Sequence, residues 1–361
     1  MREDTRPVDV DRDFWEGRRV LVTGHTGFKG AWLSLWLQAL GAEPFGIAGA
    51  APSSPSLYEL AGVGRAMQER LLDIRDADAV LGAFEAADPE IVLHLAAQPL
   101  VRRSLRDPAA TYAVNVMGTV NVLDGVRLAG PRVRAVVVVT SDKCYANDGA
   151  GRPFSEDDAL GGHDPYSSSK ACAELVTAAY RDSFFAGERA PRLASARAGN
   201  VIGGGDWGED RLLADSVRAV ESAGTLRIRN PDAVRPWQHV LNPLSGYLTL
   251  AQALHAGADV ARAWNFGPAA GDARPVGWIV RRLGELWDGA LDWELDEEPN
   301  PPEASHLELD STRAGSELGW RPPWDLQRAL ELVVEWHRAQ LDGVDMRAVT
   351  LGQIDAFAAA G

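Results

Sequence analysis

Two pairs of side chains in this 361-residue chain have the types and the spacing for proton transfer. The first pair is Tyr166 and Lys170, which lie four residues apart in "DPYSSSKACAEL" and would share one face of a helix. Tyrosine alone is a poor base because its ordinary pKa is about 10, but a neighbouring ammonium group stabilises the phenolate and lowers that pKa. The pair is therefore predicted to take a proton from a hydroxyl group, although an ordinary pair on a helix face has the same spacing.

The second pair is Asp142 and Lys143, which follow the apolar run "VVVVT". Ser141 precedes them and is placed to hydrogen-bond a hydroxyl group beside Tyr166. A simple oxidation needs only the tyrosine and its lysine, so a second acid and base indicate a reaction that also moves a C–H proton and expels a hydroxyl group. The alternative is a salt bridge that caps a strand, which contributes about 0–1 kcal/mol when exposed.

The chain contains three lysines, Lys29, Lys143 and Lys170, and arginine supplies the other basic residues. A coding bias toward arginine would have replaced a lysine whose only role was surface charge. Arginine stays protonated and cannot act as a base, and its planar fork does not replace a compact ammonium group. Lys143 and Lys170 are therefore predicted to have chemical roles.

A glycine-rich turn, "VTGHTGFKGAW", places Gly24, Gly27 and Gly30 between a strand and a helix. Glycine permits a tight turn and lets backbone N–H groups approach a pyrophosphate, to which a helix N-terminus adds partial positive charge. This context predicts a dinucleotide-binding turn, and the alternative is a glycine-rich helix start packed tightly on the sheet. The turn also contains Thr26, Phe28 and Lys29.

The second predicted strand ends in "GIAGAAP", which contains neither an acid nor an arginine. An acid there holds the ribose of NAD, and an arginine accommodates the 2′-phosphate of NADP. We expect NAD, because no basic residue follows the strand. Lys29 remains open between a solvated position at the helix start and a position near the adenosine phosphate or ribose. Asp73 and Ile74 are predicted to hold the adenine, with a carboxylate for the amino group and an aliphatic wall for the ring.

The elements that position these residues are short apolar strands that alternate with helices. Strands are predicted at Arg18–Gly24, Pro44–Ala48, Arg70–Ile74, Ile91–Ala97, Ala135–Ser141 and Arg192–Ala198, with helices among them at Ala31–Leu40, Thr111–Leu128 and Ser168–Phe185. Continuous β-branched runs separated by helices predict an α/β fold with a doubly wound parallel Rossmann sheet.

The sequence pattern changes after Asn200. Gly203–Gly205 interrupt the alternation of strands and helices, and nine of the twelve tryptophans lie beyond this point. We therefore expect a dinucleotide-binding domain over residues 1–200 and a smaller lobe over residues 201–361, with an interleaved boundary. A net charge of −15 without a basic block argues against nucleic acid as a partner. No apolar run approaches the roughly 18 residues of a membrane span. Cys144 and Cys172 form neither a disulfide framework nor a metal-ligand pattern, and we expect reduced thiols in the cytoplasm.

Together these motifs resemble the extended short-chain dehydrogenase/reductase family, in its NAD-dependent epimerase/dehydratase group. The resemblance runs from about Trp15 to Trp336 and depends on "VTGHTGFKGAWLSLWL", "HLAAQPLVRRS", "TSDKCY", "DPYSSSKACAELV", "RAGNVIGGGDW", "RPWQHVLNPLSGYL" and "WNFGP". The segment "TSDKCY" is the most specific, because family members that dehydrate CDP-sugars carry Asp-Lys there and those that dehydrate dTDP-sugars carry Asp-Glu. The resemblance implies an NAD-dependent 4,6-dehydratase of a nucleotide sugar, with a CDP-sugar as the substrate.

The resemblance also implies residue roles. Tyr166, as phenolate, would take the 4-hydroxyl proton while C4 is oxidised by NAD⁺, with Lys170 and Ser141 beside it. Lys143 would remove the C5 proton, and protonated Asp142 would donate to the departing 6-hydroxyl. Further cofactor contacts are implied at Leu95, Ala96 and Ala97, and substrate contacts at Gln98, Arg103, Asn115, Asn200, Arg211, Arg235 and Trp237. Asn115 would hold the active-site backbone, the arginines could instead form structural ion pairs, and Trp237 could instead belong to the core.

Two rival functions remain open. A nucleotide-sugar 4-epimerase shares the tyrosine and lysine chemistry but needs no elimination, so Asp142 and Lys143 argue against it. A non-catalytic NAD-binding regulator would not need to retain both pairs. The helical segments Thr111–Leu128 and Ser168–Phe185 are apolar on more than one face, which predicts a homodimer or a dimer of dimers. The resemblance implies pairing through these two helices as a four-helix bundle.

Overall fold

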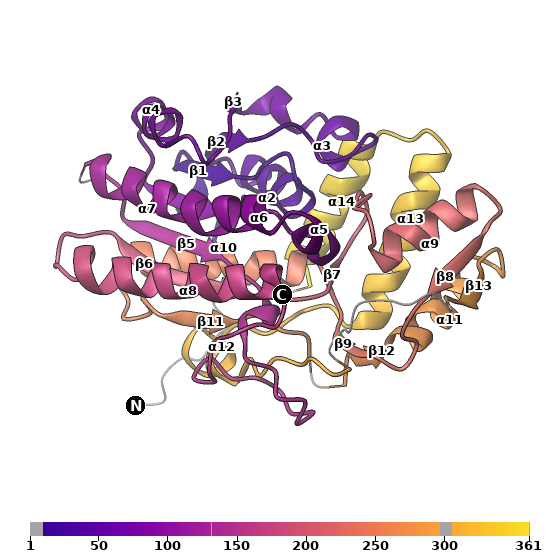
Figure 1. Ribbon diagram of the computed structural model, residues 1–361. Coiled ribbons are helices and arrows are strands. Elements are labelled where there is room, and N and C mark those ends of the chain that lie inside the picture. Colours follow the sequence, from indigo (N-terminus) through magenta and orange to yellow (C-terminus); the bar gives the residue numbers. More distant parts are fainter. Residues whose placement is uncertain (1–9, 131, 270, 297–304, 361) are drawn as a thin grey trace, which may run out of the picture.

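The centre of the computed structural model, which describes residues 10–130, 132–269, 271–296 and 305–360, is a seven-stranded parallel sheet. The strand order is β11-β6-β5-β4-β1-β2-β3 (Figure 1). This order reverses between β1 and β4, and ligands of doubly wound sheets bind beyond the carboxyl ends of the strands at such a reversal. The predicted fold class is confirmed. The strands are β1 (Arg19–Thr23), β2 (Glu43–Ala48), β3 (Gln68–Leu71), β4 (Ile91–His94), β5 (Ala135–Val139), β6 (Arg192–Arg197) and β11 (Ala263–Asn265).

Both faces of the sheet are covered by helices, which explains why its strands are continuous apolar runs. Val137 of β5 belongs to the core on one face, whereas Val136 and Val138 belong to the core on the other. The first face packs against α2 (Phe28–Ala39), α10 (Leu241–His255) and α14 (Met346–Ala358). The second packs against α4 (Ala77–Ala87), α7 (Gly118–Leu128) and α8 (Pro165–Phe184), with α7 beside α8 (Figure 1).

A smaller lobe with its own apolar core lies beside the sheet. It contains α9 (Leu212–Glu221), α11 (Val276–Leu286) and α13 (Leu326–Leu341), and the paired strands β7 (Val201–Ile202) with β10 (Gln238–His239), β8 (Thr225–Ile228) with β13 (Asp292–Leu295), and β9 (Val234–Pro236) with β12 (Ala273–Pro275). Because β11 is a strand of the main sheet and α10 covers one face of that sheet, the chain beyond residue 200 contributes to both bodies.

Short helices complete the connections of the described residues. They are α1 (Arg12–Trp15), α3 (Leu57–Leu60), η1 (Val63–Ala66), α5 (Val101–Arg106), α6 (Pro108–Tyr112), the π-helical turn η2 (Ala113–Met117), η3 (Asp142–Cys144) and α12 (Thr312–Glu317). The helix predicted over residues 111–128 is therefore divided into α6, η2 and α7. No helix among the described residues is long and apolar enough to cross a membrane.

Several element boundaries differ from the prediction by one to three residues, including those of β3 and α2, and two of the differences have identifiable reasons. Strand β4 ends at His94, because the N–H groups of Leu95 and Ala96 donate to Thr23 Oγ1 at 3.1 and 3.0 Å. Helix α8 begins at Pro165, three residues before the predicted start. Asp164 caps it by accepting the Ser167 N–H at 3.0 Å, and proline is favoured at the first helical position.

Candidate active site

The glycine turn between β1 and α2 has the shape of a dinucleotide cradle. Gly24 has φ +80, and a Cβ there would lie 2.8 Å from the backbone nitrogen of Ala96. A Cβ at Gly30 would lie 2.0 Å from the carbonyl oxygen of Gly24. Gly27 precedes α2 and supplies no side-chain cap, so the first N–H groups of this helix are left for an anion. The residues present therefore fit the pyrophosphate of NAD.

The predicted adenine contacts follow β3. Ile74 is buried, and a Cβ at Gly118 would lie 2.4 Å from its Cδ1. Asn121 Nδ2 donates to the Ile74 carbonyl at 2.9 Å, which fixes the aliphatic wall. Asp73 is half-exposed and pairs with Arg75 at 2.5 Å, so the predicted carboxylate has an arginine partner that the sequence analysis missed.

Tyr166 and Lys170 lie one turn apart on α8, and both side chains are buried. Lys170 Nζ donates to the Val139 carbonyl at 3.4 Å. Burial lowers the pKa of Lys170 to about 8, while the Glu174 carboxylate acts in the opposite direction. Burial raises the pKa of Tyr166 to about 12, although a hydrogen bond with Ser141 lowers it. Burial of the phenol is therefore the larger effect in the chain by itself, and the predicted influence of the Lys170 ammonium on the Tyr166 pKa stays a prediction.

Asp142 and Lys143 lie in η3, at the carboxyl end of β5. Ser141 Oγ accepts the Lys143 N–H at 3.2 Å and donates to Asp142 Oδ1 at 3.0 Å. Asp142 is 1% exposed, whereas Lys143 is half-buried. Among the described residues no ion pair joins Asp142 to Lys143 and no hydrogen-bond partner is found for Asp142 Oδ2. The salt-bridge alternative has no support in this geometry.

Gly199 lies against the Asp142 carboxyl group. A Cβ at Gly199 would lie 1.7 Å from Asp142 Oδ2 and 2.0 Å from its Cγ. Tyr247 of α10 is fully buried nearby, and the charge of Asp142 raises its pKa after the larger effect of burial. Sequence analysis missed both residues, because neither belongs to a short motif around the acid.

Lys29 faces the catalytic end of the crevice. Burial lowers its pKa to about 7, and the charged groups that act on it are those of Arg211, Asp142, Lys170 and Asp206. The side chain is partly exposed, and these charged neighbours differ from the Asp73 end, at which the adenosine is expected.

Gln98 and Asn115 are connected to each other inside the protein. Asn115 Oδ1 accepts the Gln98 N–H at 2.8 Å, and Asn115 Nδ2 donates to Ser169 Oγ of α8 at 2.9 Å. Gln98 Nε2 donates to Thr111 Oγ1 at 3.0 Å. Asn115 thus joins the segment after β4 to the catalytic helix.

An ion pair joins α5 to the segment that carries Arg211. Arg211 lies 3.5 Å from Asp206, and its charge acts on Tyr166. Arg103 is exposed on α5, whereas the adjacent Arg102 pairs with Asp210 at 3.2 Å. The sequence did not indicate which of the two adjacent arginines faces the smaller lobe.

The remaining predicted substrate residues follow β6 or lie in the smaller lobe. Asn200 has φ 43, and its Oδ1 is buried without a hydrogen-bond partner among the described residues. Arg235 is buried in β9 and donates to the Val234 carbonyl at 2.9 Å. Trp237 packs in the lobe core, where its Nε1 donates to the Arg274 carbonyl at 3.1 Å.

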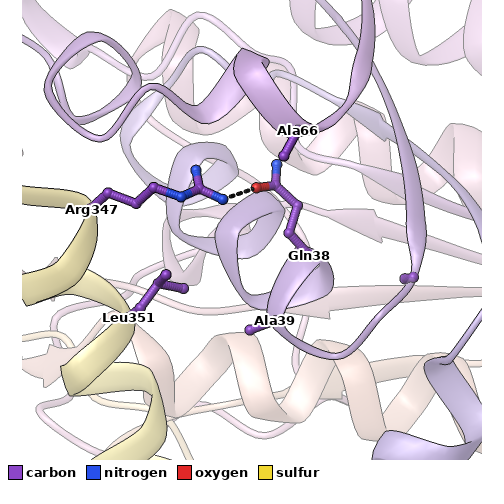
Figure 2. Close-up of a pocket in the computed structure, with 6 residues that line it drawn as sticks. Gln38, Ala39, Ala66, Arg347 and Leu351 are labelled. Carbon is purple, nitrogen blue, oxygen red and sulfur yellow. Dashed lines mark hydrogen bonds between the residues drawn. The ribbon is translucent and has the colours of Figure 1, made fainter.

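A separate pocket of about 270 Å³ lies at the other end of α2, where Arg347 donates to Gln38 Oε1 at 2.7 Å (Figure 2). The N-terminal end of this 12-residue helix is about 18 Å away along its axis. Arg347 also donates to the carbonyls of Ala61 and Gly62, so its donors serve the fold. This pocket does not belong to the site above.

Comparison with known proteins agrees with this arrangement. Residues 20–267 match the NAD dependent epimerase/dehydratase family. A CDP-glucose 4,6-dehydratase of Salmonella typhimurium is 48% identical over 356 residues, which cover 97% of this chain and 99% of that protein. A dTDP-glucose 4,6-dehydratase of Streptomyces griseus is 29% identical, with 88% of this chain and 93% of that protein covered.

Solved structures share the fold. The UDP-glucose 4-epimerase of Thermus thermophilus in complex with NAD has a TM-score of 0.77 at 25% identity, over 89% of this chain and 99% of that chain. The dTDP-glucose 4,6-dehydratase of Streptomyces venezuelae has a TM-score of 0.74 at 22% identity, over 91% and 99%. From its sequence, its crevice and these matches, the chain belongs to the NAD dependent epimerase/dehydratase family and is an NAD-dependent enzyme.

Proposed function

We propose that the chain is a CDP-glucose 4,6-dehydratase, which converts CDP-glucose to CDP-4-keto-6-deoxyglucose with loss of water. The observation that carries this proposal is the position of Ser141, whose Oγ donates to Asp142 Oδ1 and lies close enough to the Tyr166 hydroxyl to lower its pKa. One hydroxyl thereby joins the oxidation pair to the elimination pair. The 48% identity to a protein named CDP-glucose 4,6-dehydratase supports the choice of nucleotide.

The first step is oxidation at C4 of the sugar. The glycine turn of Gly24, Gly27 and Gly30 would hold NAD, which would supply the redox chemistry of the reaction by accepting a hydride from the sugar and returning it. Tyr166 takes the proton of the 4-hydroxyl group through its phenolic oxygen, and Ser141 holds that oxygen in place. The Lys170 ammonium, which donates a hydrogen bond to the Val139 carbonyl, adds positive charge one helical turn from Tyr166.

The second step is elimination across C5 and C6. The new ketone acidifies the C5 proton, and Lys143 takes that proton through Nζ. Asp142, protonated on Oδ2, gives its proton to the 6-hydroxyl group, which departs as water. Lys143 then returns a proton to C5. The buried Asp142 Oδ2 supports this assignment, because it has no hydrogen-bond partner among the described residues and is the atom available to the 6-hydroxyl group.

The smaller lobe is proposed to bind the nucleotide. Arg211 and Arg235 would hold the pyrophosphate through their bidentate forks, with Asn200, Gln98 and Arg103 toward the sugar. Trp237, in the core of the smaller lobe, would lie behind the part of the site that binds the nucleoside. In this proposal residues 1–200 bind the cofactor and residues 201–361 bind the substrate. The exceptions are α10 and β11, which belong structurally to the cofactor-binding domain.

We further propose a homodimer formed through α7 and α8. Both helices cover the sheet with one face, yet large apolar side chains on and beside them are exposed: Met117 52%, Leu128 54%, Leu175 59% and Phe184 52%. A second copy presenting the same face would bury this surface.

The direct test is incubation of the purified protein with NAD⁺ and each of CDP-, dTDP-, UDP- and GDP-glucose. We expect the ultraviolet absorbance that 4-keto-6-deoxy sugars develop in base, and we expect it with CDP-glucose. Formation of the 4-epimer without this absorbance would support the epimerase. Absence of turnover with all four sugars, despite bound NAD, would support the non-catalytic regulator.

A further inference from the structure

The turn that carries Asp142 and Lys143 ends at Tyr145, whose side chain is almost completely buried. Its ring stacks on Phe154, with centroids 5.0 Å apart and an interplanar angle of 7°. Its hydroxyl donates to Asn265 Oδ1 at 2.6 Å and accepts from Arg197 Nη1 at 2.8 Å. This one oxygen therefore ties the turn to the ends of β6 and β11 at once.

Arg197 continues the network to the catalytic helix. Its Nη2 lies 2.8 Å from Glu174 Oε2, in a pair whose side chains are only 4% and 3% exposed. Glu174 lies one helical turn after Lys170 on α8 and also accepts from Ser195 Oγ at 2.7 Å and from Thr140. A chain of buried hydrogen bonds thus leads from the helix of Tyr166 and Lys170 to the turn after Lys143.

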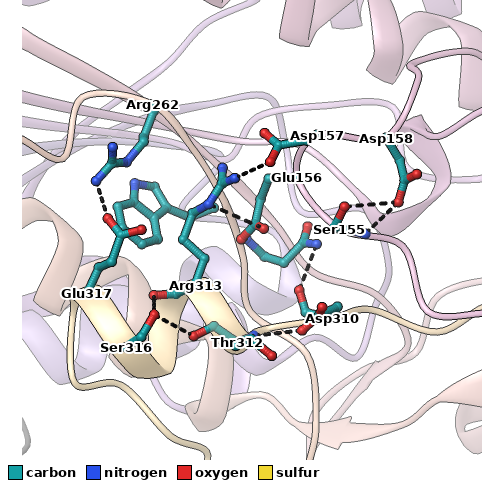
Figure 3. Close-up of polar contacts among 12 residues, drawn as sticks. Ser155, Glu156, Asp157, Asp158, Arg262, Asp310, Thr312, Arg313, Ser316 and Glu317 are labelled. Atoms are coloured by element: carbon teal, nitrogen blue, oxygen red, sulfur yellow. Dashed lines mark hydrogen bonds and ion pairs between the residues drawn. The ribbon is translucent and has the colours of Figure 1, made fainter.

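Asn265 continues the network in the other direction, toward α12. Its N–H donates to Glu156 Oε1 at 2.8 Å, and its Nδ2 donates to the Asp310 carbonyl at 3.0 Å. Glu156 lies 3.7 Å from Arg313, which also pairs with Asp157 at 2.7 Å (Figure 3). The Tyr145 hydroxyl is therefore held between two anchored groups.

The Lys143 side chain has no comparable anchor of its own. Among the described residues, the hydrogen bond found for Lys143 is that of its backbone N–H to Ser141, and no ion pair involves its Nζ. The position of Nζ consequently depends on the backbone of the turn. That backbone is held on one side by Ser141. On the other side it is held by the Tyr145 side chain, together with main-chain hydrogen bonds from Gly161 to the Cys144 carbonyl at 2.8 Å and from Ala146 to the Ala159 carbonyl at 2.9 Å.

From this geometry we propose that Tyr145 is a positioning residue that fixes the Asp142–Lys143 turn for proton abstraction at C5. The inference rests on the proposed function, because it concerns the elimination step of that reaction. A displacement of about 1 Å of a catalytic group can reduce the rate by about 10²-fold. Loss of the Tyr145 hydroxyl removes two buried hydrogen bonds at the end of the turn, whereas Lys170 keeps its own contact with the Val139 carbonyl on the far side of that network.

The test is Tyr145→Phe, which keeps the ring on Phe154 and removes the hydroxyl alone. We expect turnover of CDP-glucose to fall by about 10- to 100-fold. We also expect a larger kinetic isotope effect with C5-deuterated substrate and a smaller one with C4-deuterated substrate, because C5 abstraction becomes slower relative to oxidation. Tyr180→Phe removes the same group from a half-buried position farther along α8 and should change neither isotope effect.

The isotope effects separate positioning from a loss of folded enzyme. A smaller folded fraction lowers turnover but leaves both isotope effects unchanged, since each is a ratio measured on the molecules that turn over. Wild-type turnover in Tyr145→Phe, or reduced turnover with unchanged isotope effects, would overturn the inference. Absence of dehydration by the wild-type protein would instead overturn the proposed function.

Discussion

Gly199→Ala is the substitution whose effect follows most directly from the geometry of the site. The new Cβ would lie 1.7 Å from Asp142 Oδ2 and 2.0 Å from Asp142 Cγ. An ordinary carbon–oxygen contact is about 3.4 Å, so the carboxyl group has to move by roughly 1.5 Å or more. Asp142 would lose its hydrogen bond with Ser141 and its place beside the departing hydroxyl group.

The magnitude follows from the role proposed for Asp142. General acid catalysis contributes about 10²–10⁴-fold, and a displacement above 1 Å removes most of that contribution. We therefore expect dehydration of CDP-glucose to fall by about 10²–10³-fold, measured by the absorbance of the product in base. The glycine turn contacts Ala96 rather than Gly199, so NAD affinity, measured by fluorescence titration, should change by less than about threefold.

Two variants control this experiment. Gly352→Ala makes the same chemical change in α14, where a new Cβ would meet nothing within 4 Å, and it should retain wild-type activity. Asp142→Asn tests the same role without a steric clash and should show a comparable loss. Turnover of Gly199→Ala within threefold of wild type would refute the reasoning, because Asp142 would then not need the position that the structure shows.

Three further predictions address the base, the dimer and the buried histidines. Lys143→Arg should lower dehydration by about 10²–10⁴-fold, as Lys143→Ala does, because arginine does not release its proton; near-full turnover of the arginine variant would reduce Lys143 to a positive charge. Leu175→Glu should convert a dimer to a monomer in light scattering at micromolar concentration, whereas Leu295→Glu on β13, 51% exposed, should not; an unchanged mass would exclude α8 from the interface. Burial lowers the pKa of each of His94, His239 and His337 to about 3. Below pH 6.5 the unfolded chain then binds more protons than the folded chain, so stability falls as the pH falls. Urea unfolding at pH 5.5 should show a free energy of unfolding about 4 kcal/mol below that at pH 7.5, at about 1.4 kcal/mol for each histidine, and equal values would contradict the burial argument.

Several features of the protein follow from the sequence alone, because they depend on local spacing. The apolar run of β5 and the glycines after β1 predict strands and a tight turn without reference to distant residues. Tyr166 and Lys170 share a helix face because of their separation along the chain. The parallel doubly wound sheet follows from the alternation of apolar strands and helices, and its carboxyl edge brings Asp142 and Lys143 toward the crevice.

The tertiary structure decided what surrounds these groups, because burial and long-range contacts are not encoded in spacing. Burial raises rather than lowers the Tyr166 pKa, and the direction depends on how completely the neighbouring elements cover the phenol. The charges of Asp142 and Arg211 act on Lys29, although both residues lie more than one hundred positions away along the chain. Gly199 matters because it lies against Asp142, which is 57 positions away along the chain. Tyr145 matters because its hydroxyl bonds Asn265, which is 120 positions away. A sequence motif identifies the groups that react, whereas only the folded chain brings together the groups that hold them in place.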